Sequence, residues 1–213
     1  MSLVNVVVRK SGLAVVTLAR PKALNGLSLA MFKAVVGAAQ SLATDPAVRG
    51  VVLRGEGRGF CAGLDVPSMA KQGPGVLRTL LDREAVRVDN TREAVRVDNL
   101  AQAVGYQWRC LPVPVVCALH GVCFGGGLQI ALGADVRFST ADCRFSVMEA
   151  KWGLIPDMSA SVTLRECVPI TTAKRLSWTA EILDGNCARD VGLVTEVCEP
   201  VGSLLVALPH LIL

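Results

Sequence analysis

The sequence has no long hydrophobic run, although hydrophobic residues dominate its composition. Hydrophobic side chains make up 52% of the 213 residues, and the mean hydropathy is +0.47. A membrane-spanning helix needs roughly 18 consecutive apolar residues, and no stretch approaches that length. The nearest one, residues 204–213, is interrupted by Pro209 and His210. We therefore predict a protein with a large buried core and no transmembrane segment.

The sequence is also poor in aromatic residues and in excess charge of either sign. Aromatic residues account for 4% of the chain, which is too few for a surface on which bases stack. Its 22 basic and 18 acidic residues leave a net charge of +4, and the two signs are interspersed. These features predict no nucleic-acid partner.

Metal and disulfide patterns are missing despite eight cysteines. No Cys-x-x-Cys pair occurs, and only two histidines are available as further ligands. Most cysteines lie in apolar runs such as residues 115–118, so we predict buried, reduced thiols and no metal site. The first residues, MSLVN, lack the basic and apolar regions of a signal peptide, so we expect a cytoplasmic protein.

Two hydrophobic periodicities alternate along the chain. At about 100–200 residues per domain, the length predicts one domain, and no Pro- or Ser-rich linker divides it. The pattern predicts strands at residues 4–8, 14–18, 49–53, 113–119 and 136–139, and helices from Ser28 to the Asp45-Pro46 stop and at 128–133. This alternation indicates an α/β protein built from repeated strand-strand-helix units.

Residues 83–90 and 92–99 carry the same eight-residue sequence, REAVRVDN. Their offset is too short for a solenoid repeat, whose period is about 20–50 residues. In one helix of ~3.6 residues per turn the copies would face opposite sides, so both cannot face the core. We interpret them as a local duplication in a tolerant, solvated insertion that covers about 67–110.

Two turns of small residues are candidates for binding negative charge. One contains Gly125, Gly126 and Gly127 between an apolar run and a helix, and the other is residues 60–65, after the strand at 49–53. Unshielded backbone N–H groups at such turns suit a developing oxyanion, and two turns could supply two donors to one carbonyl oxygen. Close packing of a helix on a strand explains three glycines equally well.

Two acidic residues are candidates for proton transfer. Glu149 is a lone carboxylate in the apolar segment 145–150, where desolvation would raise its pKa toward that of a useful general base. Asp157 follows eight residues later. The structural alternatives are that Glu149 pairs with an arginine and that Asp157 caps a helix begun by Met158. His120 is expected to form a hydrogen bond in the core.

Taken together, these segments resemble the enoyl-CoA hydratase/isomerase family of the crotonase superfamily. The matching stretches are LARPKALNGLS (18–28), GRGFCAGLDV (57–66), PVVCALHGVCFGGGLQIALGADVRFS (114–139), FSVMEAKWGLIPDM (145–158) and ILDGNCARDVGLVTEV (182–197). The resemblance implies a crotonase-like spiral of ββα repeats over residues 1–198. It also implies that the family's C-terminal helical region is largely missing, with 199–213 left as an apolar tail.

The resemblance also implies a substrate and its binding residues. Family members bind the thioester oxygen of an acyl-CoA through two backbone amides, here those of Leu64 and Gly126. The residues that the resemblance assigns to acyl-CoA binding are Lys22, Ala23, Leu24, Ala62, Gly63, Leu64, Asp65, Val66, Gly126 and Gln129. Coenzyme A is part of the substrate, so no separate cofactor is expected. The resemblance implies a homotrimer or hexamer, and an apolar surface without its covering helices predicts association or poor solubility.

The acid and base positions favour one reaction within the family. Hydratases carry a second glutamate where this chain has Gln129, and an amide cannot exchange a proton at neutral pH. Double-bond migration in an enoyl- or dienoyl-CoA is therefore preferred, with Glu149 as base and Asp157 as candidate second acid. Dienoyl-CoA isomerases match Asp157 but have an aspartate at the position of Gln129. Two alternatives remain: a hydratase whose water is held by Gln129, and a catalytically impaired acyl-CoA-binding protein, which the Ser-Ala-Ser sequence at 159–161 supports because the family favours glycines there.

Overall fold

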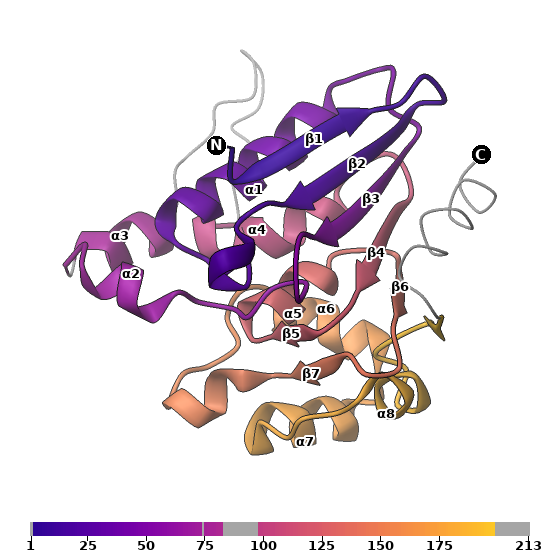
Figure 1. Ribbon diagram of the computed structural model, residues 1–213. Helices are drawn as coiled ribbons and strands as arrows, with labels where there is room; N and C mark the ends of the chain where they lie inside the picture. Colours follow the sequence, from indigo (N-terminus) through magenta and orange to yellow (C-terminus); the bar gives the residue numbers. More distant parts are fainter. Residues whose placement is uncertain (1, 74, 83–97, 199–213) are drawn as a thin grey trace, which may run out of the picture.

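The computed structural model describes residues 2–73, 75–82 and 98–198, and a twisted sheet forms the centre of this part (Figure 1). The six strands lie in the order β1-β2-β3-β4-β6-β8, and only β1 and β2 are antiparallel. Their bounds are β1 Val4–Val8, β2 Leu13–Leu18, β3 Gly50–Gly55, β4 Val115–Leu119, β6 Val136–Ser139 and β8 Glu196–Val197. A separate parallel pair consists of β5, Val122–Phe124, and β7, Arg144–Ser146.

The strands follow the hydrophobic pattern of the sequence. β2, β3 and β4 are almost continuous runs of buried residues, as expected for parallel strands that are covered on both faces. All five predicted strands are present with bounds within two residues of those expected. The mixed α/β fold is therefore confirmed.

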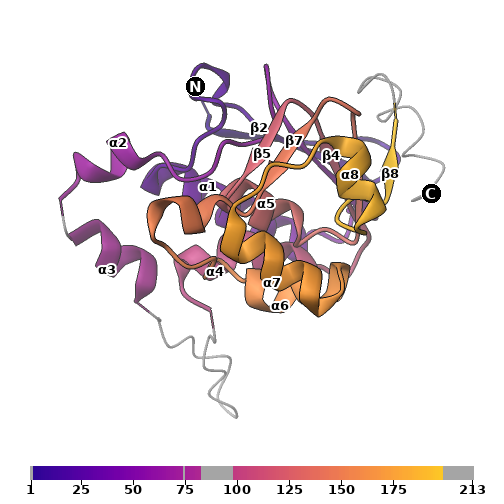
Figure 2. The same cartoon turned by 90° about the horizontal axis from the view of Figure 1, so that it is seen from below.

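Helices follow four of the eight described strands, and α1 and α4 lie together on one face of the large sheet (Figure 1 and Figure 2). The bounds of the helices are η1 Pro21–Ala23, α1 Leu29–Ala43, α2 Val66–Ala70, α3 Gly75–Leu81, α4 Leu100–Arg109, α5 Gly126–Ala131, η2 Met148–Trp152, α6 Ala160–Cys167, α7 Ile170–Thr179 and α8 Gly185–Asp190. The Ser28 side chain accepts a hydrogen bond from the Met31 N–H, which confirms the predicted start of α1. Helix α5 begins at Gly126, two residues earlier than predicted.

The prediction that residues 67–110 form a solvated insertion is wrong for helix α4, which is largely buried. It packs against α1 and α5, and Trp108 is only 1% exposed. Its start is fixed by a capping box between Asn99 and Gln102. A Cβ on Gly105 would lie 2.7 Å from the Gln129 carbonyl oxygen, so the α4 and α5 backbones are closely packed. The duplicated copies lie outside the described residues except for Asp98 and Asn99, and so does the tail at 199–213.

The cysteines only partly follow the predicted pattern. All eight are free, and four are buried: Cys61, Cys117, Cys123 and Cys143. Burial raises the pKa of the Cys61 and Cys143 thiols to about 12. The prediction of burial is wrong for Cys110 and Cys187, which are exposed, while Cys167 and Cys198 are half-buried.

Two kinds of feature are absent from the described residues: a membrane-spanning helix and a metal-binding cluster. Among these residues, no helix is long and apolar enough to cross a membrane. Within the same ranges, no group of three or more His, Cys, Asp and Glu side chains could hold a metal ion.

Replacing Trp108 with alanine tests whether α4 belongs to the core. The Trp108→Ala variant should lose about 3–5 kcal/mol of unfolding free energy, because it removes a large buried side chain. Urea denaturation followed by circular dichroism measures this loss. Val7→Ala is the control, since Val7 is 60% exposed on β1, and it should change stability little. Equal losses in the two variants would contradict the placement of α4.

Candidate active site

The two small-residue turns pack against each other, backbone to backbone. Cys61 and Cys123 form a parallel β-bridge in which the Cys61 N–H donates to the Val122 carbonyl at 3.1 Å. A Cβ on Gly127 would overlap the carbonyl oxygen of Cys61, and one on Gly63 would lie 2.8 Å from the Phe124 oxygen. The second position also has φ +88°, which favours glycine. Glycine at both positions is therefore what lets the two turns come together.

This packing brings together the two amides predicted to form an oxyanion hole. The Cβ position of Gly63 would lie 3.4 Å from the Gly126 nitrogen. Among the described residues, neither the Leu64 N–H nor the Gly126 N–H donates to a protein acceptor, whereas the Asp65 and Gly125 N–H groups both do. Leu64 and Gly126 both line a cavity of about 300 Å³. The site thus offers two unengaged donors on one cavity, the arrangement that an oxyanion hole requires.

Glu149 lies on the same cavity, in η2 just after β7. Its Oε1 accepts a hydrogen bond of 2.7 Å from Gln129 Nε2, and its Oε2 is buried without a hydrogen-bond partner in the described part of the chain. Burial raises the pKa of the Glu149 carboxyl, and the charge of Asp157 adds to the increase. The predicted arginine partner is absent from these contacts, so that structural alternative is wrong.

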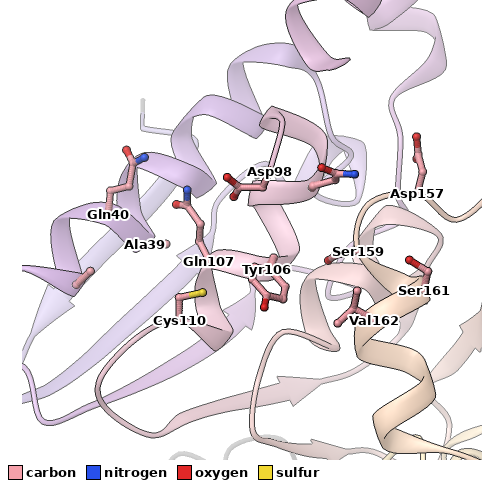
Figure 3. A pocket seen from close by; sticks show the side chains of 12 residues that line it. Ala39, Gln40, Asp98, Tyr106, Gln107, Cys110, Asp157, Ser159, Ser161 and Val162 are labelled. Carbon is pink, nitrogen blue, oxygen red and sulfur yellow. The ribbon is translucent and has the colours of Figure 1, made fainter. Parts of the chain in front are cut away.

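Asp157 also lines the cavity of Glu149, but its side chain is exposed. Figure 3 shows it at the edge of a second cavity of about 690 Å³ between α1, α4 and the start of α6. The predicted capping role is wrong, because α6 begins at Ala160 with Ser159 as its N-cap. Ser159 adopts φ +76°, a conformation that favours glycine, and it lies in the Ser-Ala-Ser segment where the resemblance implies glycines.

Gln129 is predicted to contact the acyl-CoA, but the structure places its side chain away from the cavity. Its side chain is 1% exposed and is not part of the cavity wall. It lies on the protein side of Glu149, where its Oε1 also accepts the Ala160 N–H at 3.0 Å. Both ends of the amide are therefore bound by the protein.

The predicted coenzyme A segments divide into two groups. Ala62, Gly63, Leu64 and Val66 line the cavity, as do apolar residues that the sequence analysis did not assign to the site: Phe32, Leu80, Leu81, Ala101, Met148 and Met158. Lys22, Ala23 and Leu24 belong to η1 and its end and do not line it, and neither does Asp65.

Asp65 is bound by neighbouring protein groups. Its carboxylate pairs with Arg20 at 2.6 Å and caps α2 by accepting the Ser68 N–H at 3.0 Å. The hydrogen bond from Ser68 is the main cause that lowers the pKa of Asp65. The Asp65 side chain therefore holds the end of the 60–65 turn in place.

Asn25 is a structural residue of the site that sequence reasoning missed. It is fully buried in a left-handed conformation, with φ +55°. Its Nδ2 donates to the carbonyls of Glu56, Gly59 and Phe60, each at 3.0 Å, and its Oδ1 accepts the Arg20 N–H. Asn25 thereby ties the 18–28 segment to the chain that leads into the 60–65 turn.

His120 supports the same chain from another side. Its Nε2 lies 2.9 Å from the Gly57 carbonyl oxygen, so the expected hydrogen bond is present. Its expected place in the core is wrong, because His120 is only half-buried and the bond is exposed. The Phe60 N–H in turn donates to the His120 carbonyl. His120 is not among the residues that line the cavity of Glu149.

The fold and this site define a class of protein: those that place two free backbone amides beside a buried carboxylate on one apolar cavity. The model of the enoyl-CoA hydratase/isomerase family matches residues 8–205. The chain therefore belongs to the enoyl-CoA hydratase/isomerase family.

Curated relatives include hydratases and isomerases. The chain is 29% identical to the mitochondrial methylglutaconyl-CoA hydratase of Homo sapiens over 189 residues, which are 88% of this chain and 51% of that protein. It is 32% identical to the short-chain-enoyl-CoA hydratase of Clostridium acetobutylicum, covering 94% and 71% of the two chains. It is 30% identical to the peroxisomal Delta(3,5)-Delta(2,4)-dienoyl-CoA isomerase of Arabidopsis thaliana, covering 84% and 62%. The chain thus spans about half the length of the human relative.

Solved structures of the family share the fold. The enoyl-CoA hydratase of Mycobacterium smegmatis superimposes with a TM-score of 0.79 at 29% identity, covering 99% of this chain and 76% of that one. The enoyl-CoA hydratase of Mycobacterium avium subsp. paratuberculosis K-10 gives a TM-score of 0.80 at 27% identity, covering 100% and 77%. These similarities confirm the crotonase-type fold.

Substituting Gly127 tests the packing of the two turns. Gly127→Ala should lower the unfolding free energy by roughly 1–3 kcal/mol, because the new methyl group meets the Cys61 backbone. Gly37→Ala is the matched control. Gly37 lies on the exposed side of α1 with nothing within 4 Å of its Cβ position, so this variant should gain about 0.5–1 kcal/mol. Chemical denaturation measures both, and equal effects would contradict the close approach.

Proposed function

We propose that the protein moves a carbon–carbon double bond of an acyl-CoA through a dienolate. The Leu64 and Gly126 N–H groups polarise the thioester carbonyl, which acidifies the proton on C2. Glu149 removes this proton, the double bond between C3 and C4 moves to between C2 and C3, and a carboxyl returns a proton to C4. The atoms and charges balance when Glu149 itself returns the proton to C4. If Asp157 donates it instead, Glu149 then releases its proton to solvent and Asp157 takes one up, so the proposed reaction needs no separate cofactor in either case.

The position of Glu149 beside the two free amides is the observation that carries this proposal. Its Oε2 is buried and unpaired among the described residues, whereas Gln129 lies outside the cavity wall. Two-carboxylate activation of water needs a second acid–base group at the position of Gln129, and an amide there cannot supply it. Asp157 lines the same cavity and is the candidate for the second proton transfer.

Hydration is the alternative reaction, and the hydratases among the relatives favour it. In that reaction Glu149 would activate a water molecule that adds across the double bond. Incubation with crotonyl-CoA separates the two reactions, because hydration abolishes the ultraviolet absorbance of the conjugated thioester. Strong loss of that absorbance would overturn the isomerase proposal. Binding of acyl-CoA with neither reaction would support the catalytically impaired protein.

Glu149→Gln tests the proposed base. The variant should isomerise 3-enoyl-CoA about 10²–10⁴-fold more slowly, with a nearly unchanged KM, because an amide of the same shape cannot accept the C2 proton. The rate is followed by the absorbance of the 2-enoyl product. Glu56→Gln is the control, since Glu56 is exposed and its side chain does not line the cavity. A Glu149→Gln variant as fast as the wild type would disprove the assignment.

We further propose that the chain forms a homotrimer or hexamer, and an exposed apolar surface supports this. Trp152 and Ile155 lie in and just after η2, Trp178 lies on the neighbouring α7, and they are 67%, 74% and 74% exposed. Exposed apolar patches of this kind mark interaction surfaces.

A cytoplasmic location stays a prediction, because relatives are named for mitochondria and peroxisomes.

Light scattering tests the association. The wild type should have the mass of three or more chains, and a Trp178→Ser/Ile155→Ser double variant should shift toward the monomer because it loses apolar contact area. Val7→Ser is the control, since Val7 is also well exposed but lies on β1. A wild type that is monomeric at all concentrations would contradict the proposal.

A further inference from the structure

We propose that Gln129 is a positioning residue that fixes the orientation and the charge state of the Glu149 carboxylate by clamping it to the first turn of α6. The inference rests on the proposed function of Glu149 as the base. It gives Gln129 a role other than substrate contact, and it explains why a residue that cannot carry a proton occupies this position.

The contacts of Gln129 leave its amide one orientation. The Ala160 N–H can only donate, so the atom that it meets at 3.0 Å is the side-chain oxygen Oε1. The NH₂ group then necessarily faces Glu149 Oε1, at 2.7 Å. Because the side chain is buried, water does not compete for either bond. The amide is therefore held as a donor to the base.

This donor has two effects on Glu149. It engages Oε1, which leaves Oε2 as the carboxylate oxygen without a partner in the described structure. It also stabilises the ionised form, and so adds to the larger effect of the Glu149 backbone N–H in opposing the increase in the pKa of Glu149 that burial causes. The Cβ position of Gly125 lies 3.3 Å from Oε1, so a larger residue there would crowd the clamped oxygen.

A glutamate at position 129 would behave differently. Two carboxylates within hydrogen-bonding distance share one proton, because both cannot be ionised at low cost. The pair would then titrate together, and the charge of the base would depend on its partner. Gln129 keeps the hydrogen bond while removing that second titration, which suits a reaction with one principal base.

The clamp also connects the base to α6. Ala160 is the first residue of this helix, where N–H groups lack intrahelical acceptors, and the N-cap Ser159 makes no capping hydrogen bond with its side chain. Gln129 supplies the missing acceptor from α5. Asp157, the candidate second acid, lies in the segment just before α6. The Gln129 side chain therefore links Glu149 to the backbone that follows Asp157.

A direct titration of Glu149 tests the clamp. In ¹³C NMR of uniformly labelled protein, the Cδ signal that disappears in Glu149→Gln reports the pKa of this carboxyl. Gln129→Met should raise that pKa by about one to two units, because it removes a hydrogen bond that favours the ionised carboxylate. Gln129→Glu keeps the size and the acceptor for Ala160 but loses the permanent donor, and it should also raise the upper pKa of the pair.

Thr163→Val is the matched control. Thr163 is fully buried on α6, and its hydroxyl donates to the Ser159 carbonyl without contacting Glu149. It should lower stability while leaving the pKa of Glu149 unchanged. An unchanged pKa in both Gln129 variants, or an equal shift in Thr163→Val, would overturn the proposal.

The pH–rate profile gives the second readout. The acidic limb of kcat/KM should move upward in Gln129→Met by the same amount as the NMR pKa, with KM nearly unchanged. A wild type that moves no double bond in any enoyl-CoA would refute the proposed function, and an NMR shift confined to the Gln129 variants would still establish the clamp. A rate loss without any shift of the acidic limb would show that Gln129 is merely structural.

Discussion

The close approach of two chain turns is the constraint on which the rest of the site depends. The turn at 60–65 and the turn before α5 meet backbone to backbone, and glycine at 63 and 127 leaves the space for this contact. The approach places the Leu64 and Gly126 amides on one cavity with no competing protein acceptor in the described structure. Asn25 and Asp65 hold the first turn from both of its ends. These backbone contacts thus place both donors on the cavity, as the proposed oxyanion hole requires.

A second constraint acts on charge. Glu149 is placed in an apolar cavity wall, and its burial disfavours the ionised form. Hydrogen bonds from the Glu149 backbone N–H and from Gln129 work in the opposite direction and lower the pKa of this carboxyl, so opposing influences act on the carboxylate. Such a balance keeps a base within the range of pH where it can both accept and return a proton. The Gln129 side chain also reaches α6, so the balance depends on how two helices pack.

Membership in the enoyl-CoA hydratase/isomerase family indicates acyl-CoA chemistry. Particular residues of this chain support one proposed reaction over the others. The relatives include hydratases and a dienoyl-CoA isomerase, so the family alone leaves the reaction open. Two observations support the proposed proton shuttling: Gln129 lies outside the cavity wall, and one oxygen of Glu149 is buried without a hydrogen-bond partner among the described residues. The apolar side chains that line the remaining wall suit a hydrocarbon acyl group.

The sequence by itself determined the strands, the first helix and the two glycine-bearing turns, because these depend on local periodicity and on backbone freedom. It also singled out Glu149, since a lone carboxylate in an apolar segment is conspicuous. Only the tertiary structure decided the role of α4, which local sequence left as an insertion and packing made part of the core. It likewise decided the role of Gln129, whose two partners, Glu149 and Ala160, lie 20 and 31 positions away along the chain. Contacts over such distances are set by how elements pack, and no local pattern encodes them.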